Sequence, residues 1–150
     1  MRTSPALVIA LLLASQPAMA CEIKPFLAYF NAEGSGSPEV EMVLDETVRF
    51  WRTLPSDQKS VIVQGHTDTI GDANDNQARS MAMARRVRDG LLARGVPVGV
   101  VVVEAHGETK PVIATGDNVA EALNRRVEIH LDYVHDCFPG SHIPPDPKAP

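Results

Sequence analysis

The chain has 150 residues, of which 44% are hydrophobic and 22% are charged, and its formal net charge at pH 7 is −5. A chain of this length is expected to form one domain with one modest core. Its acidic balance argues against a nucleic-acid partner, because such a partner requires a basic face that offsets phosphate charge.

The first 20 residues have the pattern of a cleaved secretory signal. Arg2 precedes an apolar run at residues 6–14, and Ala18 and Ala20 are small residues at the two positions that a signal peptidase reads. The apolar run is shorter than the roughly 20 residues that a membrane-spanning helix needs. We therefore predict that residues 1–20 are removed and that the mature chain begins at Cys21, without a transmembrane segment.

Cys21 and Cys137 are the only cysteines of the chain. In an oxidising compartment an even pair of cysteines indicates a disulfide first. A cysteine at the first mature position is also where bacterial lipoproteins are acylated, but their signals favour leucine where this chain has Ala18, and Met19 is atypical. We favour the disulfide and keep a lipid anchor at Cys21 as the alternative.

The next segments alternate between strand and helix patterns. Residues 23–30 predict a strand, and Pro38 opens a helix that extends to about residue 54 with apolar residues along one face. Residues 61–63 predict a short buried strand. A second helix is expected over residues 76–93, with Gly95 as its C-terminal stop. The apolar stripe predicted for this second helix contains Ser80, Met83, Ala84, Val87 and Leu91.

The C-terminal third completes an α/β pattern. Residues 98–104 contain a run of valines typical of a strand, residues 116–123 predict a short helix, and residues 126–134 alternate as a last strand. Residues 138–150 are proline-rich and predict an extended tail after a domain at residues 21–137. This order predicts a two-layer α/β sandwich in which the first three strands run in the same direction.

Two ungapped motifs carry a family resemblance. The first is Gly-His-Thr-Asp at residues 65–68, continued by Gly71, Asn76 and the second helix, and the other is Asn-Arg-Arg-Val-Glu-Ile at residues 124–129. These motifs resemble the outer membrane protein A C-terminal domain family, which includes the peptidoglycan-associated lipoproteins, over roughly residues 26–134. The resemblance implies a βαβαβ(α)β fold with a four-stranded mixed sheet of order 1-4-2-3.

That strand order also bears on the cysteines. It implies that the start of the first strand lies beside the end of the last, where Cys21 and Cys137 flank the two ends. A disulfide requires Cα atoms within about 7 Å. The resemblance therefore supports a bridge between these two cysteines.

The resemblance also implies a function. Family members bind the free end of diaminopimelate in the peptidoglycan stem peptide, without a cofactor and without catalysis, in the periplasm at the outer membrane or cell wall. Asp68, beside Thr67, matches the carboxylate that binds the ligand ammonium, and the helix start near Asn76 offers N–H groups and a positive dipole end for the ligand carboxylate. Asn31 occupies an acidic position of the family in the first strand.

One decisive position departs from the family. Its helix arginine, fifteen residues after the aspartate, is Met83 here, and a thioether has neither charge nor donors. In one interpretation Arg79, one helical turn earlier, replaces that arginine together with Arg125 or Arg126. In the other, Met83 joins the core, the pocket is degenerate, and the chain is an interaction protein that docks onto another envelope protein. A further arginine of the family is Glu121 here.

Enzymatic and metal-binding functions find little support in the sequence. His66, Asp68, Asp72 and His106 lack the paired spacing of a metal site, and no GxSxG or P-loop motif is present. Isolated His and Asp residues usually have structural or solvent roles. We therefore predict no metal, no cofactor and no catalytic residue.

Overall fold

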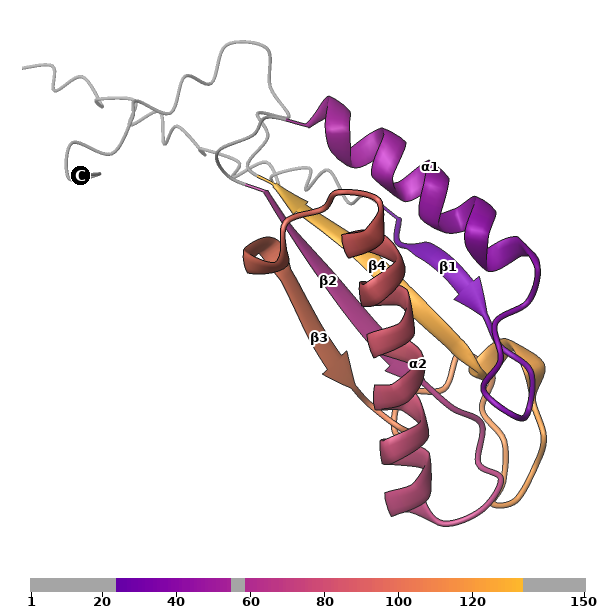
Figure 1. The fold of residues 1–150 in the computed structure, drawn as a ribbon. Helices are drawn as coiled ribbons and strands as arrows, with labels where there is room; N and C mark the ends of the chain where they lie inside the picture. The colour runs from indigo at the N-terminus through magenta and orange to yellow at the C-terminus, as the bar shows by residue number, and fades with distance from the viewer. Residues whose placement is uncertain (1–23, 55–58, 134–150) are drawn as a thin grey trace, which may run out of the picture. The chain divides into compact units, whose positions relative to one another are not determined.

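The computed structural model describes residues 24–54 and 59–133, and it shows two helices on one side of a four-stranded sheet (Figure 1). In chain order, the elements are β1 (Phe26–Tyr29), α1 (Glu39–Thr53), β2 (Lys59–His66), α2 (Ala73–Ala93), η1 (Val98–Val100), β3 (Val101–Ala105), η2 (Ala122–Asn124) and β4 (Arg126–Tyr133), where η1 and η2 are single 3₁₀ turns. No helix among these described residues is long and apolar enough to cross a membrane.

The sheet has the order β1-β4-β2-β3. β4 is antiparallel to both β1 and β2, and β2 is parallel to β3. The first three strands therefore run in the same direction, and α1 and α2 make the crossover connections that parallel strands need. The predicted two-layer α/β sandwich with order 1-4-2-3 is confirmed.

The core lies between the helices and the sheet face that they cover. Alternate residues of the two central strands are fully buried there: Val61, Val63, Val127 and Ile129. The predicted stripe of α2 is also buried, including Met83 at 4% exposure. A Cβ at Gly65 would lie 2.0 Å from the Ser80 carbonyl oxygen, so α2 approaches β2 as closely as only glycine allows.

Helix α2 begins at Ala73, three residues before the predicted start at Asn76. The Asp72 side chain caps it by accepting a hydrogen bond of 2.8 Å from the Asn74 N–H. The prediction of a start at Asn76 overlooked this cap. At the other end Gly95, at φ +91°, donates to the Leu92 carbonyl, so the predicted stop is confirmed.

Two further boundaries differ from the prediction. Residues 98–100, predicted as strand, form η1, because pairing with β2 begins only at Val101 opposite Val61. The helix predicted over residues 116–123 is absent apart from the turn η2 at its end. The segment before η2 instead hydrogen-bonds to Thr69, and Asn118 has a positive φ of 57°, which interrupts a right-handed helix.

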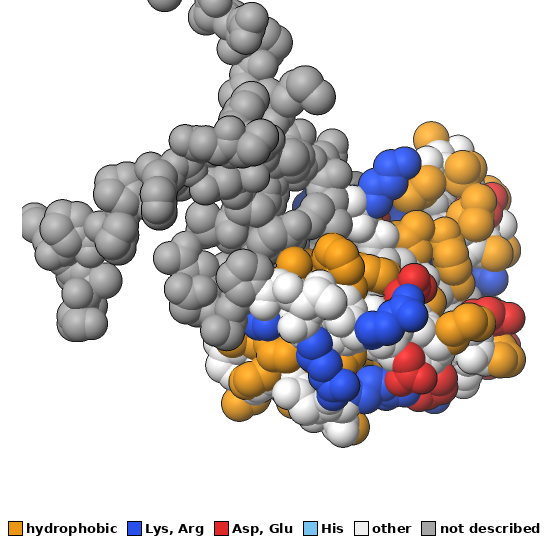
Figure 2. Space-filling model, turned by 90° about the horizontal axis from the view of Figure 1, so that it is seen from above, with side chains coloured by type: hydrophobic (Ala, Val, Ile, Leu, Met, Phe, Trp, Pro, Cys, Tyr) orange, Lys and Arg blue, Asp and Glu red, His pale blue; other side chains and the backbone are white. Residues whose placement is uncertain are grey.

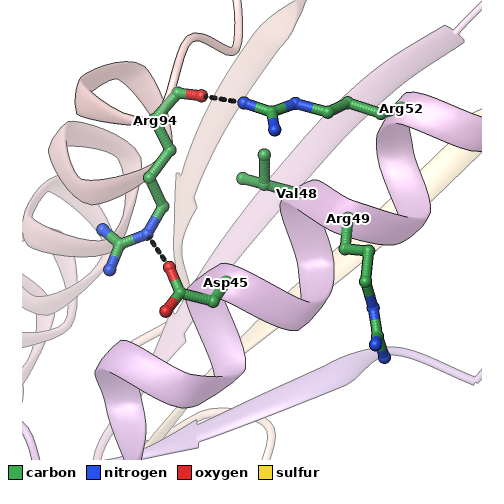
Figure 3. Close-up of a pocket in the computed structure, with 5 residues that line it drawn as sticks. All are labelled: Asp45, Val48, Arg49, Arg52 and Arg94. Carbon is green, nitrogen blue, oxygen red and sulfur yellow. Dashed lines mark hydrogen bonds and ion pairs between the residues drawn. The ribbon is translucent and has the colours of Figure 1, made fainter.

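A cluster of ion pairs joins the two helices at the C-terminal end of α2 (Figure 3). The Arg94 guanidinium donates to Asp45 at 2.6 Å and to Glu41 at 2.7 Å, and Arg52 donates to the Arg94 carbonyl at 2.9 Å. We call these four residues the helix clamp. A hollow of about 550 Å³ beside Val48 borders this clamp. Because Arg94 directs its donors at α1 and at the Gly90 carbonyl, the arrangement joins the two helices.

Charged and apolar side chains are interspersed on the face of the domain that Figure 2 shows. In the view of Figure 2, lysine and arginine side chains alternate with acidic and apolar ones over the described residues. Such mixing cancels much of the potential that a charged partner would sense from a distance.

Candidate functional site

The candidate site lies where two neighbouring strands meet at one end of the sheet. Strand β2 ends at His66 and continues into Thr67 and Asp68, and β4 begins at Arg126, directly after Arg125. His66 pairs with Arg126 in the sheet register. This pairing brings Asp68 and Arg125 to the same end of the sheet, although 57 positions separate them in the sequence.

Asp68 and Arg125 form a largely buried ion pair. Arg125 Nη1 lies 2.6 Å from Asp68 Oδ2, and the two side chains are 17% and 4% exposed. The backbone N–H of Glu121 approaches the same oxygen at 3.4 Å, and Arg125 Nε donates to the Phe30 carbonyl at 3.3 Å. The guanidinium therefore connects the ends of β1 and β2, and charge assistance makes its contact with Asp68 the strongest in the site.

A small cavity of about 10 Å³ adjoins this ion pair. It is lined by Asn31, Ala32, Gly34, Thr67, Asp68, Arg79, Met83 and Arg125. Five of the six residues predicted to bind the ligand are among these: Asn31, Thr67, Asp68, Arg79 and Arg125. The volume is about that needed for the centre of one water molecule, so these side chains leave little free space between them.

Arg79 and Met83 both line the cavity from α2. Arg79 Nη2 donates to the Ile70 carbonyl at 2.8 Å, across the turn that follows Asp68. Met83 is 4% exposed and belongs to the core cluster, and a Cβ on Gly34 would touch it at 3.9 Å. The structure thus contains one feature of each interpretation: Met83 packs in the core, and Arg79 borders the cavity.

Asn76 does not line this cavity. It is fully buried in the first turn of α2, where its N–H donates to the Asp72 carbonyl at 2.9 Å and its side-chain amide donates to Glu108. The backbone N–H that the sequence analysis offered to a ligand carboxylate is therefore already paired. Asn76 ties α2 to the loop that follows β3.

The turn at residues 31–35 contributes one wall of the site. The Asn31 side chain accepts a hydrogen bond of 2.8 Å from the Ser35 N–H, and Gly34 adopts a φ of +75°. Ala32 and Gly34 also line the cavity, although neither was among the predicted site residues. The glycine- and serine-rich run at residues 34–37 is typical of a turn, but it carries no signal that the turn packs against α2.

The opposite wall is fixed by the loop at residues 111–121. The Thr69 hydroxyl donates to the Gly116 carbonyl at 2.7 Å and accepts from the Val119 N–H at 3.1 Å. The Asn124 side chain accepts from the backbone N–H groups of Val112 and Ile113, each at 2.9 Å. These contacts hold the loop against the Asp68 turn, and they explain why the asparagine of the second motif is fully buried.

A second polar cluster lies on the sheet face that the helices leave uncovered. His66 stacks on His106 with ring centroids 5.1 Å apart, and Glu128 lies near His66, Arg126 and His130. Burial, followed by the charge of Arg126, lowers the pKa of His66 to about 4. No three His, Cys, Asp or Glu side chains of residues 24–54 and 59–133 gather closely enough to hold a metal ion.

Comparison with known sequences matches the chain to one family. The model of the OmpA family matches residues 33–125. Outer membrane protein A of Shimwellia blattae is 35% identical over 103 residues, which are 63% of this chain and 43% of that protein. The homologue in Escherichia coli O157:H7 is 34% identical over 108 residues, which are 66% of this chain and 31% of that protein. The chain therefore corresponds to less than half the length of these relatives.

Solved structures show the same fold. The peptidoglycan-associated lipoprotein from Burkholderia pseudomallei superposes with a TM-score of 0.63 at 26% identity, covering 71% of this chain and 89% of that chain. The C-terminal domain of Helicobacter pylori MotB also reaches 0.63, at 21% identity, covering 76% of this chain and 89% of that chain. The OmpA-like domain of FopA1 from Francisella tularensis reaches 0.61 at 18% identity, covering 71% of each chain.

Proposed function

Because this chain belongs to the OmpA family, we propose that it is a non-catalytic domain of the cell envelope that binds peptidoglycan without forming a covalent bond. A relative of the same fold is named for its association with peptidoglycan. The observation that carries the proposal is the meeting of Asp68, Arg125 and Arg79 around one cavity at the end of the sheet. This arrangement presents one acceptor for an ammonium and two guanidinium groups for a carboxylate.

The ligand that suits these groups is the free end of diaminopimelate, which carries an ammonium and a carboxylate on one carbon. Asp68 receives the ammonium, and Arg125 and Arg79 receive the carboxylate. Thr67 has a buried hydroxyl without a hydrogen-bond partner among the described residues, so it can serve as a further contact. Asn31, on the opposite wall, completes the polar lining.

Arg79 takes the place of the guanidinium that Met83 lacks. Positions 79 and 83 lie one turn apart on the same side of α2, and both side chains reach the cavity. Arg79 is tethered there by one hydrogen bond to a neutral carbonyl, that of Ile70. Exchanging that contact for a ligand carboxylate costs one neutral hydrogen bond and forms a stronger, charge-assisted one.

The proposed location is the periplasm, at the outer membrane or cell wall. The relatives named outer membrane protein A and the signal-like residues 1–20 both support an envelope location. Cys21 and Cys137, which we predict to form a disulfide, lie outside the described residues. Intact mass of the mature protein, with and without reductant, will distinguish the disulfide from the alternative of a lipid anchor at Cys21.

Binding to purified peptidoglycan tests the proposal directly. Sedimentation with insoluble peptidoglycan should remove the wild-type protein from solution, and Asp68→Asn should remain in the supernatant. Arg85→Gln is a matched control, because Arg85 is an exposed arginine of the same helix. If the wild-type protein does not sediment, the proposal is wrong. If Arg79→Gln sediments like the wild type, Arg79 does not replace the missing arginine.

One observation favours a second candidate function. Met83 is buried and the cavity is only about 10 Å³, so a degenerate pocket on a conserved fold would look similar. The chain would then act by docking onto another protein of the envelope. That alternative predicts no sedimentation with peptidoglycan and a protein complex that survives the Asp68→Asn substitution.

A further inference from the structure

We propose that Arg125 makes the site selective for zwitterions by exchanging partners: it pairs with Asp68 in the ligand-free protein and with the ligand carboxylate when the ligand ammonium takes Asp68. This inference rests on the proposed function of the site. It assigns the selectivity to Arg125, which lies on the strand side of the cavity and not on α2.

The first support is that an internal cation already occupies Asp68. The contact from Arg125 Nη1 to Asp68 Oδ2 is 2.6 Å, and both side chains are largely buried. The guanidinium thereby holds the place of a ligand ammonium. An incoming amine must compete with this ion pair, because the cavity of about 10 Å³ has no room for an ammonium-bearing carbon beside it.

The second support is the charge balance of the buried pair. Asp68 and Arg125 together are neutral, and a zwitterion leaves them neutral because each charge gains a new partner. A ligand with an ammonium alone would leave Arg125 without a carboxylate in a poorly hydrated position. An unpaired charge in such a place is costly, so the ion pair disfavours simple amines.

Arg79 cannot perform the same exchange. Its described contact from Nη2 is to the Ile70 carbonyl, which is neutral, so Arg79 does not compete for Asp68. Removing Arg79 should weaken carboxylate binding and leave amine binding unchanged. Removing Arg125 should weaken carboxylate binding and strengthen amine binding. This difference in sign separates the two arginines.

Two soluble fragments of peptidoglycan provide the probes: a muramyl tripeptide that ends in diaminopimelate, and the same fragment amidated at the carboxyl group on the carbon that carries the free amine. Calorimetry on the full mature chain should give the wild type a preference for the acid over the amide of roughly 10- to 100-fold, the range for one hydrogen bond to a charged group. In Arg125→Gln that preference should fall by about tenfold or more, and the amide should bind more tightly than it binds to the wild type.

Further variants keep the result interpretable. Arg125→Lys retains the positive charge and should retain most of the preference for the acid, even though lysine lacks the fork of donors. Arg79→Gln should lose affinity for the acid without gaining affinity for the amide. Circular dichroism of each variant checks that the sheet is intact before binding is measured.

The outcomes are distinct. Equal losses for both fragments in Arg125→Gln would mean that Arg125 only supports the fold, and an unchanged affinity for the amide would mean that it does not compete for Asp68. Either result overturns the exchange while leaving the proposed function standing. If neither the wild type nor Arg125→Gln binds either fragment, both proposals are wrong.

Discussion

Two arginines contact carboxylates at the two ends of α2, and their surroundings differ. Arg125 approaches Asp68 and Arg94 approaches Asp45, each at 2.6 Å. The Asp68 side chain is 4% exposed, whereas that of Asp45 is 72% exposed. The distances alone would rank these pairs as equal. Water screens the helix clamp and not the site, so only the buried pair should strongly affect stability and recognition.

The largest effect is expected from breaking the buried pair. Arg125→Ala leaves the Asp68 carboxylate buried with only the weak contact from the Glu121 N–H. The free energy of unfolding should fall by about 3 kcal/mol, the lower end of the range for removing one partner of a buried pair. Urea denaturation measures it. A loss below about 1 kcal/mol would show that this pair is as solvated as the helix clamp.

Acid should destabilise the protein through His66. Its pKa is about 4 in the fold and 6.5 in the unfolded chain, so the unfolded chain binds more protons between these values. The free energy of unfolding therefore keeps its full value above about pH 6.5 and decreases by up to about 3 kcal/mol as the pH approaches 4. Urea denaturation across this range measures the slope. His66→Phe removes the titrating group, so the free energy of unfolding should depend less steeply on pH in this range. An unchanged slope would contradict the assignment to His66.

The Arg79→Gln substitution should separate binding from stability. Arg79 is partly exposed and donates to one backbone carbonyl, so its loss should change the free energy of unfolding by less than about 1 kcal/mol. Affinity for peptidoglycan fragments should nevertheless fall roughly tenfold, which corresponds to about 1.4 kcal/mol. Parallel denaturation and calorimetry measure both quantities. A stability loss larger than the binding loss would make Arg79 a structural residue.

The smallest effect is expected at the helix clamp. The hydrogen bonds that Arg94 donates to Asp45 and then to Glu41 raise the pKa of Arg94, but both carboxylates are exposed to solvent. Asp45→Asn should therefore cost less than about 1 kcal/mol, and the cost should shrink further in high salt. Denaturation at two salt concentrations measures this. A large loss of stability that does not depend on salt would show that the Arg94 ion pairs are no more screened by water than the Arg125–Asp68 pair.

Local patterns predicted most of the fold because most elements are amphipathic on their own. The stripe of α2 and the alternation in β4 each indicate one buried face without reference to the rest of the chain. The errors fell at element boundaries, where a local cap or the limit of strand pairing decides the end of an element. The valines at positions 98 and 100 favour a strand, but they lie in the 3₁₀ turn η1, and pairing of β3 with β2 begins at Val101 opposite Val61.

The sequence predicted which residues form the site better than it predicted the contacts between them. Motif matching identified Asp68 and Arg125, and the structure brings them into direct contact. It also identified Asn76, which instead ties α2 to Glu108. A motif records which residue types occur at which spacing, but it does not record which hydrogen bonds are already made within the protein.

The sequence by itself determined the fold class, because periodicity is a property of the linear chain, and its two ungapped motifs carry the family resemblance that implied the strand order. The tertiary structure alone decided that Arg125 reaches Asp68, that Arg79 and Met83 share one cavity, and that this cavity is small. The physical reason is that burial and pairing of charges depend on residues far apart in the chain. Those two quantities, and not residue identity, set the strength of an ion pair.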